Sequence, residues 1–337
     1  MRNIIVKQGD IIYEIDYRVE LLSIIQALIY EKNKIRHFGI CEEDYYRQII
    51  KRFGDYKQHP CIIKMREMMS KHHFYYDAPV DMFLQLSNHF KCENLNDCVF
   101  IERLHEDTTI YNLMDMLYKF SKEIHYDEFY ESQKDFYIRC LNEFVQTVDK
   151  EHVTKFIIEY TGMAFKEKVC HIVIMPITNS HNYGIHHSKD VYACVCLPSQ
   201  FLEKSQVYQA DLSKLIVHEF LHSIINPITD QLQLIDEDDE LFEEIKEIMA
   251  KEAYPTLLHI INEHIIRAIT LRYLYFNFND KYETALKNEI DQQFIYISTI
   301  LDALVIYENN RNKYKTIEDF YEVIIMYMKE YYKEMRK

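Results

Sequence analysis

The motif H-E-x-x-H is the feature that most constrains this chain. It is formed by His218, Glu219 and His222 within the apolar stretch 212–225. Residues four apart lie on the same face of an α-helix, so both imidazoles can reach one metal ion. Glu219 lies beside them and can act on a water molecule at that ion. The motif therefore predicts a helix that holds a catalytic zinc ion.

The residues around the motif predict a buried helix. We expect Asp211 to cap its N-terminus and Asn226-Pro227 to end it after about four turns. Apolar side chains occupy nearly every side of the helix between these points, as in a helix of the protein core. Two histidines and a glutamate are costly there unless they are satisfied, and a metal ion would satisfy them.

A catalytic zinc ion needs three protein ligands and one open position, so a third ligand should come from another buried element. Residues 257–269 form a second strongly apolar helix, and Glu263 is the natural ligand within it. His259 and His264 are rivals, because imidazole binds zinc as readily as a carboxylate does. A chain without bound metal is the remaining alternative.

If Glu263 completes the site, the expected chemistry is hydrolysis by a zinc-activated water with Glu219 as general base. A further donor should stabilise the oxyanion of the tetrahedral intermediate. The candidates for this donor are Tyr254, His259, His264 and Tyr273. Arg267 is expected to pair with Glu263 or with another carboxylate.

The H-E-F-L-H motif, followed downstream by N-E-H-I-I-R-A, resembles the gluzincin clan of zinc metallopeptidases. The chain is most similar to an uncharacterised bacterial domain-of-unknown-function group of similar length. Three stretches carry that similarity, namely residues 16–22, 218–227 and 262–268. The resemblance implies that His218, His222 and Glu263 bind zinc and that Glu219 is the general base.

The resemblance also implies how substrate is held. A sheet edge before the metal helix, here Asn182, Tyr183 and Gly184, would bind the substrate as an added strand. A tyrosine a few turns before the ligand glutamate assists the oxyanion in the best-known gluzincins, which favours Tyr254. The chain departs from them at Arg267, where an aspartate that orients a histidine ligand is common.

Hydrophobic periodicity predicts an α+β fold that is mainly α. A β-hairpin is expected over 3–16 and a small antiparallel sheet from strands at 169–176, 182–187 and 191–197. The expected helices outside the site are 17–33, 41–53, 60–71, 79–91, 108–124, 126–148, 150–161, 283–308 and 317–336. We expect a helical N-terminal region, 1–165, and a zincin-like metallopeptidase domain, 166–337.

Net charge and cysteine content limit the classes of binding partner and the cellular location that we expect. A net charge of −15 disfavours binding to nucleic acids or to anionic membranes. The N-terminus lacks the apolar core of a signal peptide, and the eight cysteines contain no C-x-x-C pair. We therefore expect reduced, mostly buried thiols and a cytoplasmic protein, although a signal removed beforehand would change that expectation.

These observations predict a zinc-dependent peptidase that acts on peptide or protein substrates. The alternative is a catalytically silent, peptidase-like protein that binds peptides and holds a structural metal or none. Hydrolysis of a non-peptide amide is a third reading. An intact Glu219 favours an enzyme, because a purely structural site needs no general base. The sequence does not specify an oligomeric state.

Overall fold

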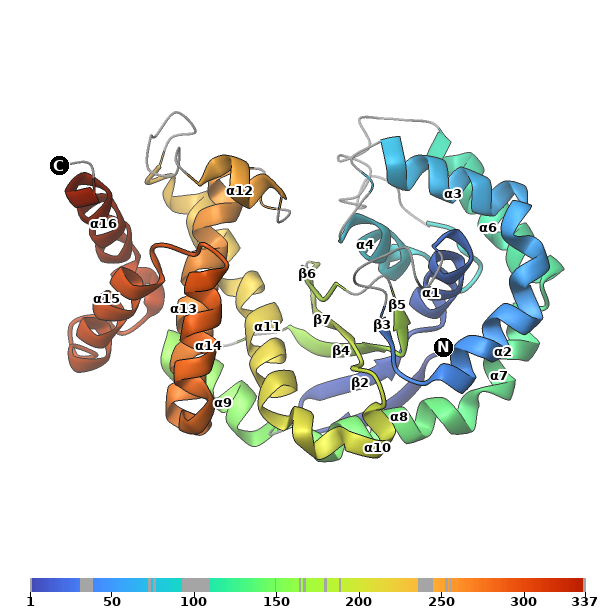
Figure 1. Cartoon of the computed structure of the whole chain (residues 1–337), viewed down its shortest axis with the longest axis horizontal. Helices are drawn as coiled ribbons and strands as arrows, with labels where there is room; N and C mark the ends of the chain where they lie inside the picture. The colour runs from blue at the N-terminus through green and yellow to red at the C-terminus, as the bar shows by residue number, and fades with distance from the viewer. Residues whose placement is uncertain are drawn as a thin grey trace. The chain divides into compact units, whose positions relative to one another are not determined.

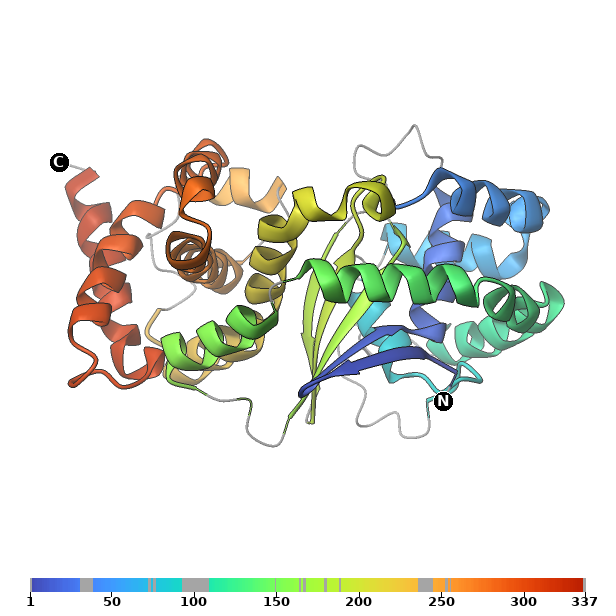
Figure 2. The same ribbon diagram turned by 90° about the horizontal axis from the view of Figure 1, so that it is seen from below.

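The computed structural model describes residues 2–335 apart from 31–38, 72–73, 75–76, 93–108, 149, 164, 166–167, 179–180, 188, 236–244, 252–253 and 255. Its chain divides into two compact units, each built from separate segments (Figures 1 and 2). The first contains 1–147, 169–185 and 192–208, and the second contains 148–168, 186–191 and 209–337. The boundaries of these units differ from those of the expected domains, 1–165 and 166–337. The division into those two domains stays a prediction.

The first unit contains most of the β-structure. Its sheet has the order β1-β2-β4-β7-β6, with a separate pair β3-β5. The strands are β1 (Ile4–Gln8), β2 (Ile11–Ile15), β3 (Gly39–Ile40), β4 (Val169–Met175), β5 (Ile177–Thr178), β6 (Tyr183–His186) and β7 (Asp190–Cys196). The expected hairpin is present as β1 and β2. The three later strands do not form a separate sheet as expected, because β2 pairs in parallel with β4 and all five strands form one mixed sheet.

Helices surround this sheet and form the rest of the first unit. They are α1 (Tyr17–Ile29), α2 (Glu43–Phe53), η1 (Gly54–Gln58), α3 (Pro60–Lys71), α4 (Ala78–Gln85), α6 (Thr109–Glu123), α7 (Tyr126–Ser132), α8 (Lys134–Thr147), α10 (Phe201–Lys204) and η3 (Ser205–Tyr208). The helix α8 packs on β1 and β2, where Figure 2 shows it crossing the sheet. The expected helix 126–148 is divided between α7 and α8 at Gln133.

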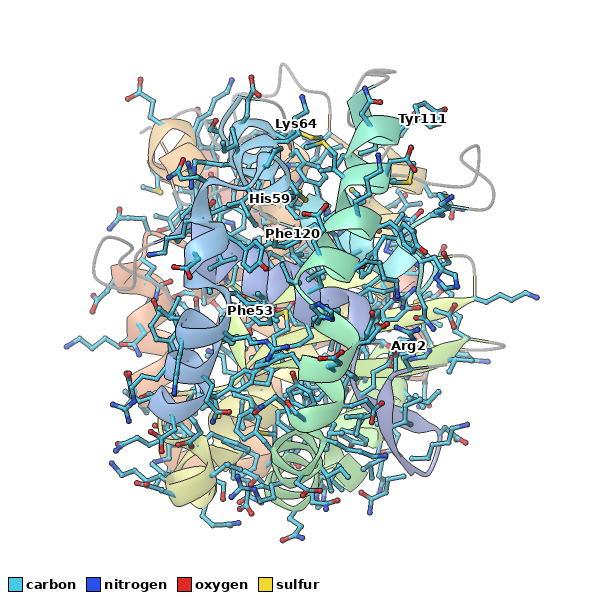
Figure 3. All side chains as sticks on the ribbon, turned by 90° about the vertical axis from the view of Figure 1, so that its right-hand side faces the viewer. Arg2, Phe53, His59, Lys64, Tyr111 and Phe120 are labelled. Atoms are coloured by element: carbon cyan, nitrogen blue, oxygen red, sulfur yellow. The ribbon has the colours of Figure 1, made fainter. Side chains whose placement is uncertain are left out.

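Histidine 59 shows how an isolated histidine serves this packing. Its Nδ1 accepts the Cys61 backbone N–H at 3.1 Å, which caps the start of α3. Its ring lies 4.8 Å from that of Phe120 on α6. Both residues are labelled in Figure 3. The ring therefore joins α3 to α6.

The second unit consists mainly of helices. They are α9 (Lys150–Thr161), α11 (Gln209–Leu232), α12 (Lys246–Lys251), α13 (Leu257–Asn277), α14 (Asn279–Asp291), α15 (Ile297–Asn309) and α16 (Ile317–Met335). The helix α13 packs on α11, α14 and α15, so it is the centre of the unit (Figure 1). The fold class α+β, mainly α, is confirmed.

The ends of α11 differ from expectation. The helix begins at Gln209, which places Asp211 in its first turn and not at the cap. It also continues through Pro227 to Leu232, although proline cannot donate a backbone hydrogen bond. The extra turn is held by Thr229, whose hydroxyl bonds to Asn262 on α13 and to Tyr321 on α16. Tertiary contacts therefore outweigh the helix-ending tendency of proline.

The cysteines match their expected state only in part. Cys41, Cys61, Cys140, Cys170 and Cys194 are buried free thiols, and Cys196 is free and half-buried. Cys92 is disulfide-bonded, so the expectation that all cysteines are reduced is wrong for this residue. Among the described helices, none is both long and apolar enough to cross a membrane.

A buried carboxyl in α1 generates the first prediction. Glu20 is 2% exposed and accepts the Tyr45 hydroxyl, which in turn lies 2.7 Å from the Tyr137 hydroxyl. Burial raises the pKa of Glu20 to about 8, although both tyrosines oppose this shift. The carboxyl is therefore protonated in the folded protein at pH 6 and ionised in the unfolded chain.

Ionisation should consequently destabilise the fold as pH rises from about 4.5 to about 8. Glu20→Gln removes this titration, so its melting temperature relative to the wild type should be higher at pH 8 than at pH 5. The corresponding gain is on the order of 3 kcal/mol. A difference that does not change with pH would contradict a buried, titrating Glu20.

Gly162 ends α9 with φ +69°, and a Cβ there would lie 2.1 Å from the Lys315 carbonyl oxygen. Gly162→Ala should therefore destabilise the protein by about 3 kcal/mol, from backbone strain and steric overlap together. Gly9→Ala is the matched control, because Gly9 has φ +58° with no atom within 4 Å of the added Cβ. It should cost only about 1 kcal/mol. Equal losses in thermal unfolding would refute the steric contribution.

Candidate metal centre

The helix α11 brings the three motif residues together on one buried surface. The side chains of His218 and His222 are 14% and 17% exposed, and that of Glu219 is 5% exposed. The two imidazole rings lie 5.1 Å apart. One ligand atom from each of the three residues lies within 4.8 Å of the others. This arrangement is compatible with binding a metal ion.

Glu263 reaches the two histidines from α13. Its Oε2 lies 3.6 Å from His218 Nε2, and its Oε1 lies 3.3 Å from His222 Nε2. Ligands about 2.0–2.1 Å from a tetrahedral zinc ion are separated by about 3.4 Å, which agrees with both distances. The shorter distance is also that of a hydrogen bond, whereas the longer one exceeds it. The distances are compatible with these three residues sharing one metal ion.

The two rival ligands have other contacts. His259 is exposed and its Nδ1 lies 2.6 Å from Oγ1 of Thr256, the N-cap of α13. His264 is buried and its Nδ1–H donates to the Ile260 carbonyl at 2.7 Å. The His264 ring contacts those of Phe294 and Tyr296 at 5.0 and 5.6 Å. Of the three candidates, Glu263 has the distances to both motif histidines that a shared metal requires.

Burial and nearby charges shift the pKa values of the two histidines in opposite directions. Burial lowers the pKa of His218 to about 3, more than the charge of Glu263 raises it. Burial also lowers the pKa of His222, but its hydrogen bond with Glu263 and that carboxylate's charge raise the value to about 9. Burial would raise the pKa of Glu263, yet the histidines hold it well below its usual range. Without metal, His222 therefore carries the proton beside an ionised Glu263.

A single guanidinium connects the candidate ligand to its surroundings. Arg267 Nε donates to Glu263 Oε2 at 3.1 Å, and Nη1 donates to Glu289 Oε2 at 2.6 Å. Its Nη2 donates to the Tyr254 hydroxyl at 3.1 Å. Arg267 therefore pairs with Glu263 and with a second carboxylate, which combines the two expected arrangements.

Glu289 is the residue of this network that sequence reasoning missed. It is the one buried residue of α14, at 3% exposed, and it also accepts from Lys214 Nζ on α11 at 3.2 Å. A glutamate on a charged helix is normally solvated, so the sequence contained no signal for its burial. The network adds α14 to the two helices that form the site.

Tyr254 precedes α13 and is half-buried. Its ring lies 6.1 Å from that of Phe294, which also lies under the Arg267 guanidinium at 4.1 Å. Burial raises the pKa of Tyr254 above its ordinary value, so its hydroxyl keeps its proton at neutral pH. The phenol is thus available as a hydrogen-bond donor.

Tyr273, the remaining candidate for the oxyanion donor, lies away from the metal cluster. It follows Glu263 by ten residues on α13, about 15 Å along the helix axis, and its ring contacts Phe156 at 5.2 Å. This position is unsuited to an oxyanion donor at the metal cluster. A cavity of about 370 Å³ lies at this same end of α13, where Phe276 and Tyr307 are among its lining residues. The cavity is therefore separate from the cluster.

The expected substrate-binding strand lies in the first unit. Tyr183 and Gly184 belong to β6, which is at the edge of the five-stranded sheet. Asn182 Oδ1 accepts the Cys196 backbone N–H at 2.8 Å and so fastens β6 to β7. This contact gives Asn182 a structural function, and substrate binding at this edge stays a prediction.

Comparison with known proteins identifies a family. Residues 11–327 match the family model described as Domain of unknown function (DUF4932). The chain belongs to the DUF4932 family. The expected relationship to a domain-of-unknown-function group is thereby confirmed. No curated protein and no solved structure matches the DUF4932 chain.

The geometry predicts that bound metal depends on His218, His222 and Glu263. Protein purified without added metal should contain near-stoichiometric zinc by elemental analysis. His218→Ala and Glu263→Ala should each weaken zinc binding by more than about 100-fold, because each removes a ligand itself. His259→Ala is the control and should keep its zinc. Retention in Glu263→Ala together with loss in His259→Ala would move the third ligand to His259.

Proposed function

We propose that this DUF4932 protein is a zinc-dependent peptidase of gluzincin type. The observation that carries the proposal is the buried cluster in which Glu263 lies 3.6 and 3.3 Å from the two histidines, with Glu219 beside them. A structural zinc site normally closes all four positions with ligands, whereas three ligands and an adjacent carboxylate are typical of a hydrolytic site.

His218, His222 and Glu263 would hold the zinc ion, which supplies Lewis-acid polarisation of water when bound. Glu219 would accept a proton from the attacking water and deliver it to the leaving amine. Its position supports this function, because Glu219 Oε2 lies 4.0 Å from His222 Nε2. Burial of Glu219 at 4% exposed also limits its access to bulk water.

The Tyr254 hydroxyl would donate a hydrogen bond to the oxyanion of the tetrahedral intermediate. The expected substrate is an extended peptide or an unfolded protein segment that pairs with the edge strand β6 near Asn182, Tyr183 and Gly184. A cytoplasmic location and the absence of nucleic-acid or membrane partners complete the proposal. The alternative, a silent peptide-binding protein, differs in having no use for Glu219 as a base.

Glu219→Gln separates these functions, because glutamine cannot accept the proton but preserves the shape of glutamate. The variant should keep its zinc and its melting temperature while peptide cleavage falls about 10²–10⁴-fold. Turnover would be measured with a mixed fluorogenic peptide library and with fluorescently labelled unfolded casein.

The exposed Glu322→Gln on α16 is the matched control and should cleave like the wild type. Two results would argue against the peptidase. One is cleavage by the Glu219 variant at the wild-type rate, and the other is a zinc-loaded wild type that cleaves no peptide in the library.

A further inference from the structure

The network around Arg267 extends the proposed function and rests on it. We infer that Arg267 is a positioning residue, held by Glu289, that aims the Tyr254 hydroxyl at the oxyanion beside the metal ligand Glu263. Arg267 itself has no contact with substrate in this assignment. The inference follows from the directions of the hydrogen bonds and from the burial of the residues that make them.

The first step concerns the direction of the hydrogen bonds. A guanidinium only donates, so the Tyr254 oxygen must accept from Arg267 Nη2. The tyrosine proton is then not used in this bond and can be donated elsewhere. Arg267 thereby fixes the oxygen of Tyr254 and leaves its proton for a developing negative charge.

The second step concerns position. The Nε–H and Nη2–H bonds lie on the same edge of the planar guanidinium and point outward in parallel. The acceptors on that edge are Glu263 Oε2 and the Tyr254 hydroxyl, both at 3.1 Å. One rigid group therefore holds the phenol oxygen beside the carboxylate that faces both histidines. A lysine, with a single rotatable ammonium group, cannot impose this parallel geometry.

The third step concerns how Arg267 is itself held. Nη1 donates to Glu289 at 2.6 Å from the opposite side, and Glu289 is bound in addition by Lys214. The Phe294 ring lies 4.1 Å from the guanidinium carbon and also contacts Tyr254. Each of the three nitrogens of Arg267 therefore donates one hydrogen bond within the network, which fixes the plane of the guanidinium.

The charges also favour this interpretation. Arg267 and Lys214 balance Glu263 and Glu289, and Arg267 and Glu289 are 19% and 3% exposed at their side chains. Removing one partner of a buried pair leaves an uncompensated charge and is strongly destabilising. Replacing a buried ion pair by apolar residues of similar volume is often neutral or stabilising, so stability is a weak explanation for the Arg267–Glu289 pair.

The test is a double-mutant cycle of Tyr254→Phe and Arg267→Lys in the full-length, metal-loaded protein. If Arg267 acts through Tyr254, each single change lowers kcat by about 100-fold with little effect on KM. The double variant should then be no slower than Tyr254→Phe alone. Rate losses that multiply in the double variant would overturn the inference.

A second readout does not depend on turnover. Acetohydroxamate is a small probe that binds zinc or cobalt through oxygen atoms, and its affinity for the cobalt-substituted protein can be followed by visible absorption. Tyr254→Phe and Arg267→Lys should each weaken it about tenfold, and the double variant no further. His259→Ala should bind it like the wild type. Weakening in Tyr254→Phe but not in Arg267→Lys would also overturn the inference.

Measured metal content distinguishes a failure of the proposed function from a failure of the inference about Arg267. A wild type that binds neither zinc nor cobalt contradicts the proposed function. Arg267→Lys that loses the metal, while Tyr254→Phe keeps it, contradicts only the inference, because Arg267 would then act on Glu263 alone. Glu289→Asp guards against misfolding of Arg267→Lys. It keeps the arginine and the negative charge that balances it, and it should weaken acetohydroxamate binding about threefold, with its metal retained.

Discussion

The hydrogen bonds of the Arg267 guanidinium are the interactions on which the candidate site depends. The guanidinium joins a residue that precedes α13, a carboxylate on α13 and a carboxylate on α14 through three separate nitrogens. Each of these groups would be costly to bury alone, and together they satisfy one another. Under the proposed function, Arg267 would orient the carboxylate of Glu263 from the position at which gluzincins commonly have an aspartate that orients a ligand histidine.

Much of the architecture was predictable because its causes are local. Periodicity located α3, α9 and the hairpin β1–β2, and helical spacing alone put His218 above His222. The parallel pairing of β2 with β4 was not predictable, since it joins segments more than 150 residues apart and no local pattern specifies it.

The site was predictable to a similar extent. The choice of Glu263 followed from a simple rule, that an apolar helix does not bury an idle carboxylate. The same rule failed for Glu289, because α14 is too polar for its one buried residue to be recognised. Pro227 was misleading in the opposite direction. A local helix-ending signal was overridden by contacts of Thr229 with two other helices, which lie far away in sequence.

The turn beyond Pro227 has a consequence for how the site is built. Thr229 lies two turns after His222 on α11, and it bonds to Asn262, the neighbour of Glu263 on α13. This bond joins the two helices two turns from His222 and opposes the sliding of one helix along the other. The fold itself therefore sets the separation of the candidate ligands. A metal ion bound by the proposed site would spend little of its binding energy on ordering the chain.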